Sequence, residues 1–535
     1  MTTPAGYLCI ALHAHLPYIR HPEKYYTMEE NWLYEAITET YIPLLAYFSN
    51  LIDDGIPFKI TMSLSPTLCA MLDNKLLQDR YVNHIDRLIE LAENEIRRTR
   101  YNRTMNRTAY AYLERFSLCK HIFEEKYERG LVAGFKKLQD AGVLEIVTCA
   151  ATHGYLPNMR DNANAVRAQI EIAVQSYIDR FGQKPRGIWL PECGYYQGLE
   201  NILDKCGIRY TFMESHGLLN ADYPPASGVF APVKFRDAHN VSAFARDAES
   251  SRSVWSADEG YPGDPHYREF YKDIGHDLDM RYIAPYIDPA GIRINTGIKY
   301  HRVTNKHDPA KQLYNRENAL RRASVHASDF VYKREAQIKN LSASMDRPPI
   351  IVAPYDAELF GHWWYEGPEW LNFLIRKCAQ KQNTFHLTTP SEYLDRHPSS
   401  HICTPAFSSW GDGGYSHIWL NETNEWMYPH LHRLEDRMVE CAGEYYHTSN
   451  ALETRALNQI ARELLLAQSS DWAFIMKTGT TVEYATRRFK EHVASFLSLY
   501  DQLKGHNLDE SFIALLESHN DIFPNIDFRI YSGST

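Results

Sequence analysis

The sequence predicts an α/β protein built on a barrel-like domain of parallel strands, and three observations support this fold class. Short apolar runs recur along residues 1–71 and 142–404, and each ends in polar or proline-containing sequence. Helical patterns separate these runs, as repeated strand–helix units require. Residues 72–141 and 405–535 show helical patterns without strand signals. We therefore expect a catalytic barrel, a helical insertion at 72–141 and a helical C-terminal domain at 405–535 that contributes to the active-site cleft.

The composition of the 535-residue chain excludes several classes of protein. Its formal net charge of −10 argues against a nucleic-acid or anionic-membrane partner. No apolar run approaches the roughly 20 residues that a membrane span needs. Nine cysteines without a CxxC pair are typical of reduced thiols, so we expect a cytoplasmic protein. We also expect a monomer or a small homo-oligomer. Aromatic residues make up 13% of the chain, which favours the binding of sugar rings.

The first predicted strand, residues 7–12, is followed by His13 and His15. Side chains of a strand alternate between its two faces, so these histidines point the same way. They can act together as metal ligands or as donors to sugar hydroxyls, whereas a single histidine is more often structural. His153 follows a later predicted strand, at 143–148, in the same manner.

Two carboxylates follow further apolar strands. Glu192 comes after residues 187–190 and Pro191, and Asp356 follows an apolar run that Pro354 stops. Because chemistry in parallel α/β folds takes place at the C-terminal ends of the strands, we expect the two to meet over one face of the barrel. Two carboxylates flanking an acetal act with retention at about 5–5.5 Å and with inversion at about 6.5–9.5 Å. For Glu192 alone, a surface salt bridge is an equally good interpretation.

Several helices and one irregular region complete the pattern. Amphipathic spacing predicts a helix at about 31–51, kinked near Pro43. Further helices are expected at about 163–181, 198–205, 309–344 and 451–467. Between 220 and 265 the helical pattern breaks around two short strand candidates, and the aromatic, proline-rich sequence predicts a lid. Tyr223 and Phe230 are the candidates for its aromatic residue.

Four motifs together resemble the conserved blocks of glycoside hydrolase family 57. They are His13-Ala14-His15-Leu16-Pro17-Tyr18, Trp189-Leu190-Pro191-Glu192-Cys193-Gly194, Pro354-Tyr355-Asp356-Ala357-Glu358-Leu359-Phe360-Gly361-His362-Trp363 and Ser470-Asp471-Trp472. The cysteine after Glu192 and residues 260–264 and 408–411 resemble the 1,4-α-glucan branching enzymes of that family in particular. The resemblance covers nearly the whole chain. It implies a distorted (β/α)7 barrel and a retaining mechanism without a metal or other cofactor.

The resemblance also implies roles for single residues. Glu192 is the implied nucleophile and Asp356 the implied general acid/base of an enzyme that cleaves α-1,4 linkages and forms α-1,6 branches in glycogen-type polysaccharides. The implied glucan-binding residues are His13, His15, His153, Trp32, Tyr261, Trp363, Trp410, Trp419 and Asp471. The chain departs from the family at Ala14, where many members carry Gln, and at His276, where relatives often carry an aromatic.

Three alternatives stay open at this point. An α-amylase or 4-α-glucanotransferase on the same scaffold would result if a defective lid let water intercept the glycosyl-enzyme. A metal-dependent deacetylase would use His13 and His15 as ligands. A glucan-binding protein without activity would leave both Glu192 and Asp356 idle.

Overall fold

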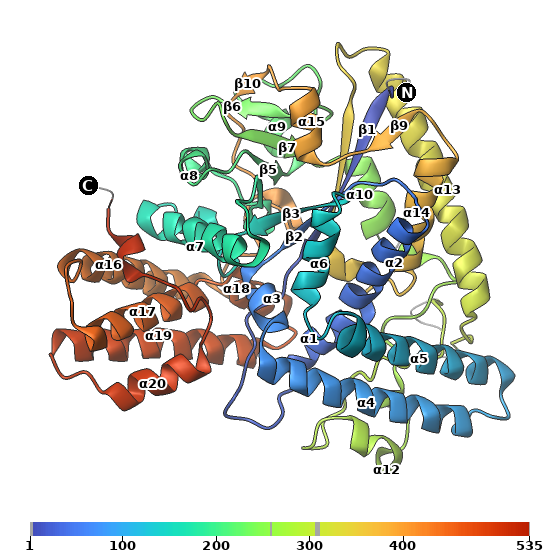
Figure 1. Ribbon diagram of the computed structural model, residues 1–535, viewed down its shortest axis with the longest axis horizontal. Coiled ribbons are helices and arrows are strands. Elements are labelled where there is room, and N and C mark those ends of the chain that lie inside the picture. The colour runs from blue at the N-terminus through green and yellow to red at the C-terminus, as the bar shows by residue number, and fades with distance from the viewer. Residues whose placement is uncertain (1–3, 257–258, 305–310, 534–535) are drawn as a thin grey trace.

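The computed structural model describes residues 4–256, 259–304 and 311–533. At its centre lies a mostly parallel sheet with the strand order β10-β6-β7-β5-β4-β3-β2-β1-β8 (Figure 1). The strands are β1 (Gly6–Ala14), β2 (Ile60–Leu64), β3 (Leu144–Cys149), β4 (Gly187–Trp189), β5 (Tyr210–Met213), β6 (Val233–Phe235), β7 (Ser242–Ala245), β8 (Ile350–Asp356), β9 (Phe385–Leu387) and β10 (Ile402–Cys403).

In the described part of the chain, seven parallel strands close into a distorted barrel. β1, β2, β3, β4, β5 and β7 pair in that order, and β8 pairs with β1. The ring closes just beyond β7, where the Asp247 N–H donates to the Val352 carbonyl of β8 at 2.9 Å. β9 lies beside the start of β1, and β6 and β10 extend the sheet outside the ring. The predicted (β/α)7 fold is confirmed.

The helix predicted at 31–51 contains a wide turn near its proline. It consists of α1 (Glu30–Ala36), the π-helical turn η1 (Ile37–Tyr41) and α2 (Ile42–Asp53). Pro43 has no N–H, so it cannot donate to the carbonyl of Glu39 one turn earlier. Arg115 donates to this carbonyl instead, at 3.0 Å. The expected kink is therefore a π turn next to the proline.

The helices between β2 and β3 divide into two groups. α4 (Lys75–Arg98) and α5 (Arg103–His121) pack on each other and extend away from the strands (Figure 1). α3 (Pro66–Leu72) and α6 (Leu131–Asp140) stay with the barrel, because α6 contacts both β3 and α2. We propose that α4 and α5 form the body of the insertion, which is smaller than the expected 72–141.

The remaining helices of the barrel domain surround the strands. Two of them, α7 (Ala163–Phe181) and α8 (Leu199–Lys205), agree with the ranges predicted from sequence, and α13 (Arg316–Ser342) begins later than predicted, with residues 309–310 outside the described ranges. The others are α9 (Ser215–Leu219), α10 (Ala248–Trp255), α11 (Ile274–Asp277), α12 (Met280–Ile283), α14 (Gly367–Gln380) and α15 (Pro390–Arg396). None of the helices in the described residues combines the length and apolar character needed to cross a membrane.

The C-terminal helices form a layer at one side of the barrel (Figure 1). They are α16 (Tyr428–Glu444), α17 (Ala451–Ala467), α18 (Ser470–Thr478), α19 (Val482–Lys504) and α20 (Glu510–His519). The start of α18 reaches the strand ends, because the Ser470 N–H donates to the His153 carbonyl at 3.1 Å. The turn before α18 therefore lies against the loop after β3.

Candidate active site

Glu192 lies in a strained turn directly after β4. Its backbone has φ 56° and ψ 28°, and Cys193 also has a positive φ of 49°. A left-handed backbone costs about 1–3 kcal/mol in a residue other than glycine and persists where the surroundings hold it, often at functional sites. Here the Trp410 N–H donates to the Glu192 carbonyl at 2.6 Å. The Glu192 side chain is 25% exposed, so its carboxyl group can be reached from solvent.

Asp356 ends β8 beside the first histidine of β1. It is the register partner of His13 in the β1–β8 pair. Two residues later, the Glu358 carboxylate accepts from the His15 backbone N–H at 3.3 Å and from the Tyr41 hydroxyl of η1. The end of β8 is therefore held against the end of β1 and against the π turn.

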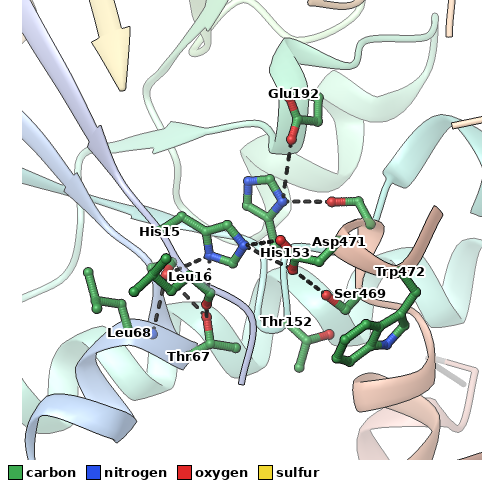
Figure 2. A network of polar contacts seen from close by, with 12 residues as sticks. His15, Leu16, Thr67, Leu68, Thr152, His153, Glu192, Ser469, Asp471 and Trp472 are labelled. Carbon is green, nitrogen blue, oxygen red and sulfur yellow. Dashed lines mark hydrogen bonds and ion pairs between the residues drawn. The ribbon is translucent and has the colours of Figure 1, made fainter. Parts of the chain in front are cut away.

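Three histidines, His13, His15 and His153, form a stacked layer at the ends of β1 and β3. Figure 2 shows His15 and His153 of this layer. The rings of His15 and His153 lie 3.8 Å apart and nearly parallel, and His13 lies 5.2 Å from His153. Nε2 of His13 is 3.0 Å from Nε2 of His153, whose Nδ1 is 2.7 Å from the Ser470 hydroxyl. The same Nδ1 is 4.0 Å from the Glu192 carboxyl group. The structure therefore brings the predicted histidines and Glu192 together.

Asp471 brings the C-terminal domain into this layer (Figure 2). Its two carboxylate oxygens lie 3.1 and 3.2 Å from Nε2 of His15, while Nδ1 of His15 lies 2.9 Å from the Ser65 hydroxyl. Burial alone would raise the pKa of Asp471, but the charge and hydrogen bond of His15 outweigh it and lower this pKa to about 2. Asp471 is therefore ionised and holds the His15 ring in one orientation.

The two carboxyl groups at the strand ends have raised pKa values. Burial raises the pKa of Asp356 to about 7. Burial, and then the charges of Asp356 and Asp471, raise the pKa of Glu192 well above its ordinary value. Because burial and the Asp356 charge both oppose ionisation of Glu192, a proton is retained at these two carboxyl groups near neutral pH. Burial lowers the pKa of His13 and His153 well below the usual value, so both rings are neutral.

The predicted aromatic platforms lie at different depths. Trp363 is 54% exposed and stacks on Phe270 at 4.4 Å. Trp410 is 8% exposed and lies 5.1 Å from Trp189. Trp32 is half-buried against the C-terminal domain. Trp363 is the member of this set that offers an open ring face.

Trp419 and Tyr261, both predicted to bind glucan, are covered by other side chains in this structure. Trp419 is 1% exposed and stacks on Tyr155 at 4.8 Å. Tyr261 is 8% exposed, stacks on His326 at 4.6 Å, and donates from its hydroxyl to Asp329 at 2.8 Å. Both rings are covered by protein, so their role in this structure is packing.

The two lid candidates lie away from the carboxyl pair. The Phe230 carbonyl accepts from the Ile350 N–H at 2.9 Å, at the amino end of the strand whose other end carries Asp356. The Tyr223 carbonyl accepts from the His401 ring at 2.8 Å, next to β10. The prediction of Phe230 as a lid residue is therefore wrong, and Tyr223 is held at the added edge of the sheet.

Two features of the barrel mouth were missed from sequence. Arg246, just after β7, forms a 2.6 Å ion pair with Glu214, just after β5, and lies 5.5 Å above the Trp410 ring. Trp255, the last residue of α10, contacts Trp410 at 5.9 Å. The one available signal for Trp255 was its position inside the 220–265 region. His276, at the position where relatives often carry an aromatic residue, lies in α11 and is exposed.

Two sets of side chains in the described ranges have ligand atoms close enough to hold a metal ion. They are His13, Cys149 and His153, and His15, His153 and Asp471. Burial raises the pKa of the Cys149 thiol well above its ordinary value, so this sulfur is protonated and a poor ligand. Both ring nitrogens of His153 already have hydrogen-bond partners. A metal ion would have to replace these bonds.

Comparisons with known proteins agree with this geometry. Residues 9–331 match the family model "Glycosyl hydrolase family 57". The chain belongs to glycosyl hydrolase family 57. In addition, residues 430–531 match the model "1,4-alpha-glucan branching enzyme, C-terminal". The predicted family membership is thus confirmed.

Three similar proteins are informative. A 1,4-alpha-glucan branching enzyme of Thermococcus kodakarensis is 35% identical over 96% of this chain and 76% of its own length. The crystal structure of the alpha-amylase AmyC from Thermotoga maritima is 47% identical with a TM-score of 0.92, covering 99% of both chains. The GH57-type branching enzyme from Pyrococcus horikoshii is 32% identical with a TM-score of 0.89, covering 99% of this chain and 97% of that one.

Proposed function

We propose that this family 57 protein is a retaining 1,4-α-glucan branching enzyme whose nucleophile is Glu192 and whose general acid/base is Asp356. The proposal rests on the position of Asp471, whose carboxylate contacts Nε2 of His15 in the histidine layer. This residue comes from the helical segment whose residues 430–531 match the branching-enzyme model. We also propose a cytoplasmic location, since all nine cysteines are free thiols.

In the first half-reaction the protonated carboxyl of Asp356 gives its proton to the glycosidic oxygen of an α-1,4-glucan. The C1–O4 bond breaks while the Glu192 carboxylate forms a bond to C1, and the 4-hydroxyl end of the chain leaves. This step needs one protonated and one ionised carboxyl group. Both pKa values are raised, so the pair retains a proton near neutral pH, and the reaction requires this proton to lie on Asp356 and the negative charge on Glu192.

In the second half-reaction a 6-hydroxyl of an acceptor glucan attacks C1 of the glycosyl-enzyme. Its proton moves to the Asp356 carboxylate, the bond between C1 and Glu192 breaks, and an α-1,6 linkage forms with net retention. Water attacking in the same position gives hydrolysis. Branching therefore depends on how well the acceptor competes with water.

The histidine layer binds the sugar rather than moving protons. His13 and His153 are neutral, and Nδ1 of His13, which has no hydrogen-bond partner among the described residues, leaves that ring one hydrogen bond for a sugar hydroxyl. His15 is oriented by Asp471 on one side and by Ser65 on the other. Such fixed polar groups can bind ring hydroxyls without rearrangement during the reaction.

Hydrolysis is the second candidate function, because the 47% identical structure is that of an alpha-amylase. The same two carboxyl groups serve both reactions. The difference lies in the acceptor of the second half-reaction.

The deciding experiment is incubation of the purified protein with amylose. New α-1,6 linkages are counted by NMR and after debranching, and new reducing ends are counted in parallel. A branching enzyme makes many α-1,6 linkages with few net reducing ends. Reducing ends without α-1,6 linkages would contradict the proposal and identify an amylase. Retention of activity in a chelator excludes a metal-dependent mechanism, and Glu192→Gln is the inactive control.

A further inference from the structure

A row of aromatic rings leads from the barrel interior to the surface. The His13 ring stacks on Trp189 at 4.7 Å and 3°, and Trp189 lies 5.1 Å from Trp410. Trp410 in turn contacts Trp255 at 5.9 Å. Exposure increases along the three tryptophans, from 0% to 8% to 37%. The Glu192 carbonyl is bonded to the Trp410 N–H, so this row passes directly beside the turn that carries Glu192.

The outermost ring of the row, that of Trp255, is 37% exposed. Trp255 and Trp410 meet at an interplanar angle of 84°. In such an edge-to-face contact Trp410 covers at most one face of the Trp255 indole. A tryptophan retained for packing alone is usually buried more completely. An indole face open beside an active site is well suited to the apolar face of a pyranose.

The helix that carries Trp255 is attached to the strand of the general acid/base. The Tyr355 hydroxyl, one residue before Asp356, donates to the Ser250 carbonyl of α10 at 3.0 Å. The first turn of α10 is held as well, because Asp247 caps it and pairs with the buried Arg334 at 3.1 Å. Trp255 therefore lies at the end of a fixed helix.

The position next to β8 assigns Trp255 to one side of the scissile bond. The general acid/base stands on the side of the leaving group, and the acceptor enters from that side in the second half-reaction. The nucleophile occupies the other face of the sugar. Because α10 is bonded to the strand that ends in Asp356, the acceptor role proposed below takes the Trp255 ring to lie on the acceptor side.

We propose that Trp255 is an acceptor-binding residue: the incoming glucan chain stacks on its indole during the second half-reaction, and this contact favours transfer over hydrolysis. The inference rests on the branching function proposed above and adds the residue that selects the acceptor. Stacking places the acceptor 6-hydroxyl at C1 of the glycosyl-enzyme, where its oxygen forms the new bond and its proton goes to Asp356. Without the stack, water takes this place and the same proton transfer yields a reducing end.

The test compares three substitutions of Trp255 with wild type. Trp255→Ala removes the ring, Trp255→Leu keeps apolar bulk without an aromatic face, and Trp255→Tyr keeps a ring. The control is Tyr332→Ala, which removes a 71% exposed tyrosine on α13. For each variant, α-1,6 linkages formed per α-1,4 linkage cleaved are measured on amylose, together with the acceptor concentration at half-maximal transfer. Circular dichroism and the thermal midpoint verify folding.

We expect Trp255→Ala and Trp255→Leu to lower the branch-to-cleavage ratio by roughly fivefold or more, and to raise the half-maximal acceptor concentration, while cleavage of α-1,4 linkages persists. Trp255→Tyr and Tyr332→Ala should stay within about twofold of wild type. An unchanged ratio in Trp255→Ala, with a wild type that branches, overturns the acceptor role alone. A Trp255→Leu protein that branches like wild type would show that bulk, and not an aromatic face, is required. A wild type that makes no α-1,6 linkages overturns the proposed function and the acceptor role together.

Discussion

The histidine layer and the carboxyl pair, Glu192 and Asp356, lie close together but differ in hydrogen bonding, backbone strain and the direction of their pKa shifts. In the layer, the ring nitrogens of His15 and His153 have partners, and the Asp471 carboxylate is kept ionised by His15. At the pair, Glu192 sits on a left-handed backbone and both carboxyl groups have raised pKa values. Apart from Nδ1 of His13, which has no hydrogen-bond partner in the part of the chain that the structure describes, the layer is satisfied, whereas the pair is held in an unfavourable state.

This difference separates binding from reaction. A satisfied polar layer binds hydroxyls in a fixed geometry and contributes little change of its own. An unsatisfied carboxyl pair gains stabilisation when a proton and a glycosyl group are transferred, which is what catalysis requires. Substitutions in the pair should therefore abolish turnover, and substitutions in the layer should weaken it.

The largest effect is expected for Glu192→Gln. It removes the nucleophile while keeping the size of the side chain, so turnover should fall by about 10⁴-fold or more with glucan binding preserved. Initial rates on amylose and equilibrium binding to a maltooligosaccharide measure the two quantities. Glu422→Gln, an exposed position, is the matched control. Unchanged turnover in Glu192→Gln would refute the assignment.

A smaller effect is expected for Asp471→Asn in the layer. It removes the charge that orients His15, and losing one charged hydrogen bond of about 1–3 kcal/mol corresponds to roughly 5–150-fold in kcat/KM. The fold should persist, but the thermal midpoint should fall at pH 7 because the stabilising contact of the Asp471 carboxylate with His15 is lost. Asp501→Asn on α19 should leave both the rate and the thermal midpoint unaltered. A loss as large as that of Glu192→Gln would place Asp471 among the reacting groups and remove the contrast.

The pH dependence tests the shared proton. Because burial raises the pKa of Asp356 to about 7, this carboxyl group loses its proton as pH rises through about 7, and activity should decline there. For Asp471 the sign is opposite: its pKa is lowered to about 2, so its contribution to stability is present above about pH 4 and is lost as pH falls towards 2. A rate that is flat from pH 6 to 9 would contradict a protonated general acid.

The smallest effect on catalysis is expected for Trp419→Ala. Because this ring is almost fully buried, the substitution should lower stability by about 3–5 kcal/mol and reduce the thermal midpoint. KM for amylose should stay within about twofold of wild type if the ring only packs. Trp363→Ala, which removes the exposed ring, is the comparison and should raise KM more. A large KM increase in a stable Trp419→Ala protein would restore the role predicted from sequence.

Sequence reasoning succeeded where the place of a residue in the fold follows from the local pattern of apolar and polar residues. The strand ends of His13, His15, Glu192 and Asp356 were predictable because apolar runs stop at prolines or polar residues, and parallel strands end on one face. The family motifs then supplied the roles of these residues and the (β/α)7 count. Local sequence was also sufficient for α7 and α17, whose bounds agree with the predicted ranges.

Prediction failed where tertiary packing decides the outcome. Trp419 and Trp363 are equivalent in sequence terms, but one is stacked on Tyr155 and the other is open. Phe230 precedes a short strand that joins the sheet outside the barrel, and this topology has no local signal. Trp255 follows the same pattern: its place beside Trp410 depends on how α10 packs on β8.

The central claim, that Glu192 carries the glycosyl group between the two half-reactions, can be tested by trapping. A 5-fluoro-α-glucosyl fluoride slows the second half-reaction, so the glycosyl-enzyme accumulates and mass spectrometry of the digested protein locates the label. We predict a single fluoroglucosyl ester on the peptide containing Glu192, absent from Glu192→Gln. A label on Asp356, or an inverted product formed without any labelled enzyme, would contradict the account.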